Sequence, residues 1–391
     1  MTEEYYTWRE FEATVADERI LWAGKPGLES WDALDPATRL LAEGMSARPG
    51  PRVLDLRCGT GICGALAARR GALVTLCDDN LVAVEAARRT LALNGLTGQV
   101  IHGDGAIQPC KGSESSEVCF DLVLLDTPRG REWVRHLLGV AAHALRPGGK
   151  LLLAGPNRGG IKGFMEDARE IVGPCEVARI KAGHRLAVAE KSGQPGVANH
   201  RSPSRDGQVC EATVRGRTIR FITRPGVFSH GELDAGTRAL IETMVIRPGE
   251  VVLDLGCGCG IIGAVAAQAA RQAILVDCSA AALEASRATL ELNKATAHTQ
   301  VIASDCASAV RDMRFDVVVT NPPFHQGLGV EFHVAQQFVR DAAEVLLEGG
   351  GRLILVANRF IRYERTMRDL FAKVLTLYED RRFQVLEAVR R

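Results

Sequence analysis

The sequence predicts a two-domain α/β protein, in which each domain has a mostly parallel sheet with helices on both faces. Two observations lead to this prediction. Short apolar runs alternate with longer amphipathic stretches along the chain, and the first half of the chain is repeated in the second half. With 391 residues, of which 46% are hydrophobic and 24% charged, the chain can form two ordinary globular cores.

The repeat consists of four matches in the same order and at nearly the same offset. Asp55 and Asp254, each in a Val-Leu-Asp-Leu run, are 199 positions apart, and so are Asn94 and Asn293. The two later matches pair residues 120–125 with 315–320 and residues 146–151 with 348–353. A repeat of this length indicates a duplicated domain rather than a solenoid unit. We expect a first domain at residues 1–191, a linker rich in Pro, Gly, Ser and Asn at 192–212, and a second domain at 213–391.

The elements of the second copy can be located in order. Five apolar runs predict strands, at 251–255, 273–277, 299–303, 315–320 and 351–357. The stretches between them predict helices, at 261–270, 280–293 and 334–347. Residues 212–214 and 218–223, on either side of Arg215-Gly216-Arg217, predict a hairpin that opens this domain. Because strands and helices alternate, ligands are expected beyond the carboxyl ends of the strands.

Charge, length and cysteine content exclude several classes of protein. The net charge of +1 gives no global signal for a nucleic-acid partner. No basic apolar leader follows Met1, and no run approaches the roughly 18 apolar residues of a membrane span, so a cytoplasmic protein without membrane association is expected. The eleven cysteines form no Cys-x-x-Cys pair and are interpreted as reduced core residues. We expect no metal site.

A glycine loop follows the first strand of the second copy. Asp254 precedes Gly256, Gly258 and Gly260, at the point where the strand turns into a helix. Glycines there let a ligand approach the backbone and the helix amino terminus. The spacing is not the dinucleotide Gly-x-Gly-x-x-Gly, and a carboxylate before the loop would repel a pyrophosphate. The same carboxylate suits a ligand with an ammonium group, and S-adenosylmethionine carries such a group together with a sulfonium cation.

Two further carboxylates end the next two strands. Asp277 can accept hydrogen bonds from a ribose diol, and Asp305 can accept one from the adenine amino group. Each of these residues could instead be a helix N-cap, because Asp favours such turns. We expect both to contact the cofactor.

Strand four ends in Asn321-Pro322-Pro323-Phe324. Two prolines cannot continue a strand, and they hold the Asn321 amide and the Pro322 carbonyl in fixed positions. Together these two acceptors can bind both hydrogens of a planar exocyclic amine and orient it toward a methyl donor. Phe324 offers a face on which a flipped-out base could stack. The alternative is a proline-rich turn beside a core phenylalanine.

These motifs resemble the Rossmann-like class I methyltransferases that modify exocyclic or amide nitrogens. Three further segments, Pro225–Ser229, Leu233–Thr237 and Val356–Phe360, make the second domain most similar to one family, the duplicated-domain ribosomal RNA guanine-N2 methyltransferases. Within that family it is slightly more similar to the small-subunit (16S) members than to the large-subunit members. The resemblance implies that residues 321–324 bind the target guanine and that Phe228, Asp234 and Thr237 lie near the methionine end of the cofactor. The expected catalytic residues are Asn321, Pro322, Pro323 and Phe324. The expected cofactor-binding residues are Phe228, Asp234, Thr237, Asp254, Gly256, Cys257, Gly258, Gly260, Asp277, Cys278, Asp305, Cys306 and Asn321.

The first copy lacks the loop glycine and the Asn-Pro-Pro-Phe side chains that the proposed chemistry needs. Arg57 replaces the first glycine of its loop, and residues 126–129, Asp-Thr-Pro-Arg, replace Asn-Pro-Pro-Phe. Asp78 keeps the ribose position, so residual cofactor binding stays open. We expect this degenerate domain to serve as a scaffold that grips RNA, and the family's amino-terminal half is likewise regarded as non-catalytic.

Ribosomal RNA or an assembling ribosomal subunit is the expected partner of a monomeric enzyme. Arginine clusters at 201–224 and 359–368 are candidates for phosphate contact, although solvated helix faces would have the same composition. The alternative functions are methylation of 23S rRNA guanine, of a protein glutamine or of DNA adenine, and a non-catalytic assembly factor that binds the cofactor. The target nucleotide and subunit stay open at this point.

Overall fold

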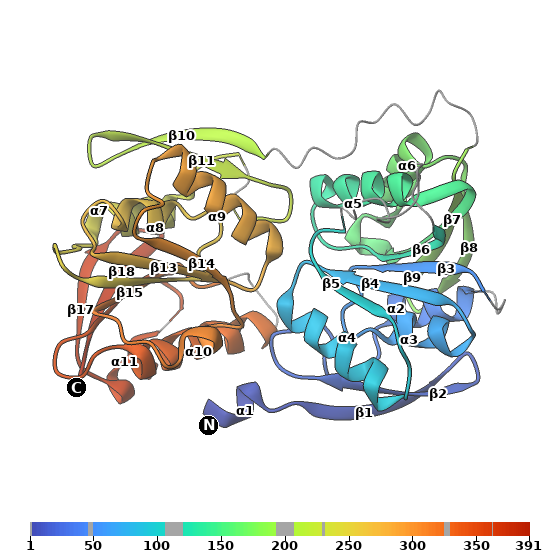
Figure 1. Ribbon diagram of the computed structural model, residues 1–391, viewed down its shortest axis with the longest axis horizontal. Coiled ribbons are helices and arrows are strands. Elements are labelled where there is room, and N and C mark those ends of the chain that lie inside the picture. The colour runs from blue at the N-terminus through green and yellow to red at the C-terminus, as the bar shows by residue number, and fades with distance from the viewer. Residues whose placement is uncertain are drawn as a thin grey trace. The chain divides into compact units, whose positions relative to one another are not determined.

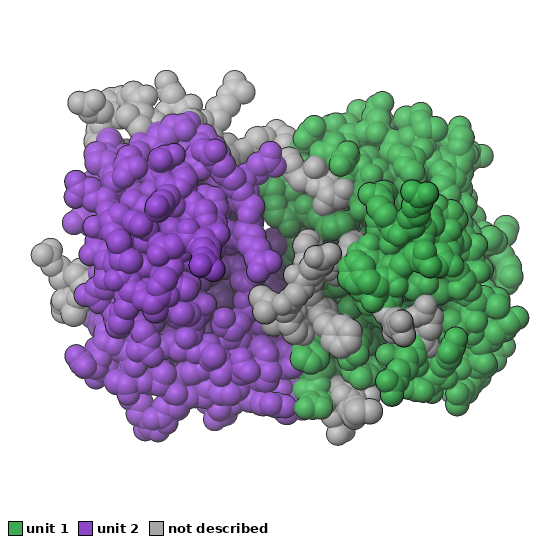
Figure 2. Space-filling view, turned by 180° about the vertical axis from the view of Figure 1, so that it is seen from behind, with its two compact units in different colours: residues 1–6, 206–391 green, residues 7–205 purple. Residues whose placement is uncertain are grey.

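The chain forms two compact units (Figure 2). The computed structural model describes residues 2–45, 50–105, 120–192, 207–228, 231–323, 329–361 and 363–391. One unit is Thr7–Arg205, and the other joins Met1–Tyr6 to Asp206–Arg391. This division differs from the expected 1–191 and 213–391, because the first six residues pack with the second domain. Of the expected linker 192–212, residues 193–206 lie outside the described residues and 208–212 belong to a strand.

The carboxy-terminal unit is built on a seven-stranded sheet in the order β14-β13-β12-β15-β16-β18-β17. The first five strands in this order are parallel, and β18 runs antiparallel to both of its neighbours. The sequence located those five strands but not the last two. The strands are β12 (Val251–Leu255), β13 (Gln272–Asp277), β14 (Thr299–Ala303), β15 (Val317–Thr320), β16 (Arg352–Asn358), β17 (Phe371–Glu379) and β18 (Phe383–Arg390).

Helices cover both faces of this sheet, as Figure 1 shows. One face carries α7 (Ala235–Thr243), α8 (Ile261–Ala266) and α9 (Ala280–Leu292), and the other carries α10 (Gly329–Val345) and α11 (Tyr363–Leu370). All five residues of β12 are buried, which is why this strand reads as an apolar run instead of an alternating one. Among the described residues, no helix is long and apolar enough to cross a membrane.

The amino-terminal unit repeats this topology in the order β5-β4-β3-β6-β7-β9-β8, which confirms the duplicated α/β fold. Its strands are β3 (Arg52–Leu56), β4 (Leu73–Asp78), β5 (Gln99–His102), β6 (Phe120–Asp126), β7 (Leu145–Pro156), β8 (Cys175–Lys181) and β9 (His184–Glu190). Its helices are α2 (Pro36–Gly44), α3 (Ile62–Arg69), α4 (Leu81–Leu93), α5 (Arg131–Ala144) and α6 (Ile161–Ile171).

Each unit also has a two-stranded hairpin, β1 (Arg9–Val15) with β2 (Glu18–Gly24), and β10 (Gln208–Val214) with β11 (Arg217–Thr223). Both turn residues of the second hairpin, Arg215 and Gly216, have positive φ, as a two-residue type I′ turn requires. The repeated asparagine at the end of the long helix holds the hairpin. Asn293 donates to the Arg220 carbonyl and accepts from the Arg220 N–H, and Asn94 binds Leu21 in the same way.

Candidate active site

The expected site residues of the second domain gather at the carboxyl ends of β12, β13, β14 and β15. In a parallel sheet these ends share one edge, so residues far apart in the sequence meet there. Thr320 at the end of β15 donates its hydroxyl to the Leu255 carbonyl at the end of β12, at 2.7 Å. This bond fixes the glycine loop relative to the Asn-Pro-Pro segment.

The three glycines of the loop are needed for two different reasons. All three have positive φ, at 74°, 53° and 77° for Gly256, Gly258 and Gly260. A Cβ on Gly260 would lie 2.8 Å from the Cα of Ser286, so this glycine lets α8 begin against α9. A Cβ on Gly258 would meet no atom within 4 Å. The backbone at Gly258 is therefore open to a ligand.

Asp277 is fixed to the loop by its own carboxylate. One oxygen accepts the N–H of Gly258 and the other the N–H of Ser279, each at 2.9 Å. These two hydrogen bonds set the plane of the carboxylate. Asp78 makes the same pair of bonds to Gly59 and Asn80 in the first copy.

Asp254 is a buried carboxylate with an unsatisfied atom. Its Oδ2 accepts the Gly263 N–H at 2.8 Å, whereas its Oδ1 is buried without a hydrogen-bond partner. Burial, together with the nearby Asp277 carboxylate, raises the pKa of Asp254 to about 7. A cation beside the loop would stabilise the ionised form. The residues of the loop thus fit a positively charged cofactor.

Asp305 lies just beyond β14, and its neighbours include residues that the sequence analysis missed. Its Oδ1 accepts a hydrogen bond from the Tyr5 hydroxyl at 2.9 Å, and the Cys306 thiol donates to the oxygen of the same hydroxyl. Cys306 has positive φ, at 49°. Tyr5 lies on the short helix α1 (Thr2–Tyr6), 300 residues away in sequence. No local sequence pattern links a five-residue helix to such a distant site.

Two other predicted site cysteines lie in the loop and at the end of β13. The buried Cys257 thiol lies 3.2 Å from the Ser286 hydroxyl, and burial raises its pKa well above the ordinary value. Cys278 follows Asp277 and is half-buried. The raised pKa keeps Cys257 protonated, so it serves as a small packing residue beneath the loop and not as a nucleophile.

Asn321 is oriented by two residues of a different segment. Its side-chain Nδ2 donates to the Thr237 hydroxyl at 2.8 Å and to Asp234 Oδ2 at 3.2 Å. Asp234 is the N-cap of α7, and its carboxylate also accepts the Thr237 N–H. Because both amide hydrogens are engaged, Asn321 presents its Oδ1 as an acceptor, and this atom is buried without a partner.

The remaining substrate-side residues are only partly described. Pro322 is buried and Pro323 half-buried, whereas Phe324 lies outside the described residues, so its stacking role stays a prediction. Phe228, expected near the methionine end of the cofactor, is 45% exposed.

The first copy has the same backbone around different side chains. Arg57 adopts a φ of 63° where the loop of the second copy has Gly256. Its guanidinium forms an ion pair with Glu29, and the charges of Asp126 and Asp78 also act on it. Burial raises the pKa of Asp126 to about 7. A protein cation therefore lies among the carboxylates of this copy, which argues against a cationic cofactor there.

The first arginine cluster is largely engaged inside the protein. Arg215 donates to the Ile241 and Met244 carbonyls at the end of α7, and Arg224 pairs with Glu284. Arg201, Arg205 and Arg362 lie outside the described residues. In the second cluster, Arg365 and Arg368 are exposed and Arg359 pairs with Glu379. Residues 363–368 are thus the better candidates for phosphate contact.

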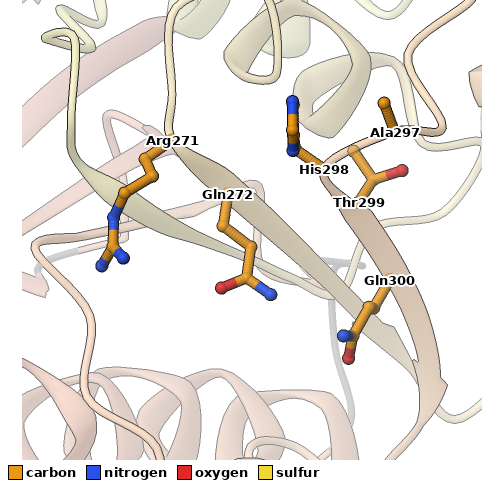
Figure 3. A pocket seen from close by; sticks show the side chains of 6 residues that line it. All are labelled: Arg271, Gln272, Ala297, His298, Thr299 and Gln300. Atoms are coloured by element: carbon orange, nitrogen blue, oxygen red, sulfur yellow. The ribbon is translucent and has the colours of Figure 1, made fainter.

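A shallow polar hollow lies at the opposite edge of the catalytic sheet (Figure 3). It is lined by residues at the starts of β13 and β14: Arg271, Gln272, Ala297, His298, Thr299 and Gln300. None of the expected site residues lines it. The carboxyl edge, with its unsatisfied buried oxygens, is the better candidate for the active site.

Comparison with known proteins assigns the family. The model of the methyltransferase small domain matches residues 20–187 and again 218–387. The ribosomal RNA small subunit methyltransferase C of Hahella chejuensis is 33% identical over 73% of this chain and 85% of its own length, and that of Pseudoalteromonas atlantica is 35% identical over 69% and 77%. The T. thermophilus 16S rRNA N2 G1207 methyltransferase, solved with AdoMet and guanosine, matches all of both chains at 31% identity and a TM-score of 0.82.

These matches confirm the predicted fold, the S-adenosylmethionine cofactor and methyl transfer as the chemistry. They also favour the small-subunit branch of the resembled family over the large-subunit branch. The chain belongs to the ribosomal RNA small subunit methyltransferase C family of duplicated-domain, S-adenosylmethionine-dependent enzymes.

Proposed function

We propose that this enzyme methylates the exocyclic N2 of a guanine in 16S rRNA, at the position named for the T. thermophilus relative, and that Asn321 holds the reacting amine. The observation that carries the proposal is the Asn321 side chain. Its two hydrogens are taken by Asp234 and Thr237, and its Oδ1 is a buried acceptor without a partner. A buried oxygen of this kind costs free energy unless a donor reaches it.

A guanine N2 amine supplies such a donor. Asn321 Oδ1 and the Pro322 carbonyl would accept its two hydrogens, orient the nitrogen and localise its lone pair. Neither oxygen is a strong base, and none is needed before attack, because the amine can lose its proton as the new bond forms. Phe324 would stack on the flipped-out base. The bound cofactor supplies an electrophilic methyl group on a sulfonium cation.

The cofactor would be held by the carboxyl edge of the sheet. Gly258 gives access to the backbone, Asp277 would bind the ribose diol and Asp305 the adenine amino group. Asp254 lies deepest, and its unsatisfied Oδ1 suits the positive charge of the ligand. Phe228 and Cys278 would border the site, and Cys257 and Cys306 would support it.

The first domain is proposed to grip RNA without catalysis. Its Arg57 lies among Glu29, Asp78 and Asp126. In this domain the positive charge beside the carboxylates thus belongs to the protein, whereas in the second domain the cofactor would supply it. We expect one cofactor per chain. Isothermal titration with S-adenosylhomocysteine measures this stoichiometry, and a value of two would contradict the proposal.

The function is tested with labelled S-adenosylmethionine and 30S subunits or naked 16S rRNA from a strain that lacks the gene. Wild type is compared with Asn321→Ala, and the product nucleosides are identified. We expect label in N2-methylguanosine, with a rate that falls about a hundredfold or more in the variant, the loss typical when one positioned polar group is removed. Label in another nucleoside, in 23S rRNA or in protein would refute the proposal.

A further inference from the structure

The amino-terminal helix belongs to the catalytic domain, although the chain leaves it for the other domain. Residues 1–6 group with 206–391, and α1 packs against α10. Tyr5 is 5% exposed and belongs to the same apolar core as Phe315, Phe338 and Tyr363. The next strand, β1 in the other unit, begins at Arg9. Helix α1 is thus an integral part of a domain whose other residues begin two hundred positions later.

The two tyrosines of α1 bind the segment that follows β14. The Tyr5 hydroxyl donates to Asp305 Oδ1 at 2.9 Å. The Tyr6 hydroxyl donates to Asp341 of α10, and the same Asp341 oxygen accepts the Ala307 N–H. The segment 305–307 is therefore held at its side chain by Tyr5 and at its backbone by the Tyr6–Asp341 pair.

The first copy holds its equivalent carboxylate in another way. Asp104 follows Gly103, whose N–H binds the Asp78 carbonyl as that of Ser304 binds the Asp277 carbonyl. Its partner is His136, 3.2 Å away on α5 of the same domain. The catalytic copy instead takes the partner of Asp305 from the start of the chain.

The Tyr5 hydroxyl stays protonated near neutral pH and therefore remains a hydrogen-bond donor. Burial raises the pKa of Tyr5 far above the ordinary value of a tyrosine, and the neighbouring Cys306 and Asp305 raise it further. A protonated phenol bound to Oδ1 fixes the rotamer and the plane of the Asp305 carboxylate. In the proposed function, this carboxylate accepts a hydrogen bond from the adenine amino group of the cofactor.

We propose that α1 is part of the cofactor site, and that Tyr5 is a positioning residue which aligns Asp305 for recognition of the adenine amino group. The inference rests on the proposed role of Asp305. It adds a residue from outside the repeated domain to the binding site, and it makes adenine recognition depend on the docking of the amino terminus.

The test uses the full chain with Tyr5→Phe, which keeps the buried ring and removes only the hydroxyl. Tyr363→Phe is the matched control, because Tyr363 is a buried tyrosine of the same core, on α11. Titration calorimetry gives the Kd of S-adenosylhomocysteine and of S-inosylhomocysteine, which has an oxo group in place of the amino group. Asp305→Ala is measured in parallel.

We expect Tyr5→Phe to weaken S-adenosylhomocysteine roughly tenfold, as for one hydrogen bond to a charged group, and to weaken the inosyl analogue much less. The preference for the adenosyl ligand should fall in Tyr5→Phe and Asp305→Ala and persist in Tyr363→Phe. If Asp305→Ala loses the preference and Tyr5→Phe keeps it, the role of Tyr5 is refuted and that of Asp305 stands. If Asp305→Ala also keeps it, both assignments fall, while methyl transfer to guanine is judged separately by the nucleoside assay.

Discussion

Substitution of Thr237 isolates the orientation of Asn321 from its chemistry. Thr237→Val removes the hydroxyl that accepts from Asn321 Nδ2 at 2.8 Å and keeps the shape of a side chain that is only 7% exposed. A hydrogen bond contributes about 1 kcal/mol, and a buried donor left unpaired costs about 1–3 kcal/mol. Because Asp234 still accepts the other hydrogen, we expect kcat/KM to fall about five- to twentyfold, at about 1.4 kcal/mol per factor of ten.

Single-turnover methyl transfer to 30S subunits measures this loss, and calorimetry with S-adenosylhomocysteine shows whether cofactor binding changes. Thr237→Ser is the control, since it keeps the hydroxyl and should remain near the wild-type rate. Our reasoning is refuted if Thr237→Val transfers methyl groups at the wild-type rate. It is also refuted if the entire loss appears in cofactor affinity, because Thr237 would then act on the cofactor and not on Asn321.

Three further substitutions test the loop and the first domain. Gly260→Ala places a Cβ against Ser286 at a positive φ and should lower the free energy of unfolding by about 2–4 kcal/mol in urea titrations; an unchanged midpoint would contradict this. Because the folded pKa of Asp254 is raised to about 7, its contribution to stability is present at low pH and is lost as the pH rises from about 4 to 7. Asp254→Asn should therefore gain stability over wild type with rising pH, by about 1.4 kcal/mol per unit, and bind cofactor more weakly; a pH-independent difference would argue against the raised pKa. Arg57→Met should lower the melting temperature and leave kcat within about twofold, whereas a large loss of kcat would give the first domain a catalytic part.

The sequence predicted those features that local residues determine. The glycine loop and its flanking strands follow from the positive φ angles that Gly256, Gly258 and Gly260 adopt and from the apolar run of β12. The repeat was also informative, because Asn94 and Asn293 make the same hairpin contacts in both copies. Local chemistry was therefore sufficient for the duplicated α/β fold and for the position of the glycine loop.

Features that depend on distant partners could not be predicted from local patterns. Asp234 and Thr237 were recognised only by resemblance, and their contact with Asn321 joins residues more than 80 positions apart. The five-residue α1 has no periodicity to detect, and its tyrosines meet partners 300 positions away. The edge strand β17 escaped prediction because most of its residues are exposed, so it lacks the apolar pattern of the buried strands.

The separation of α1 from the rest of its domain by residues 7–205 has a consequence for biosynthesis. Tyr5 of α1 binds a segment that is synthesised 300 residues later. At a synthesis rate of about 5–20 residues per second, roughly 15–60 s pass before the partners of α1 are made, and residues 7–205 can fold in this time. The amino-terminal domain is then complete before the catalytic domain exists, and the docking of α1 comes late in the maturation of the enzyme.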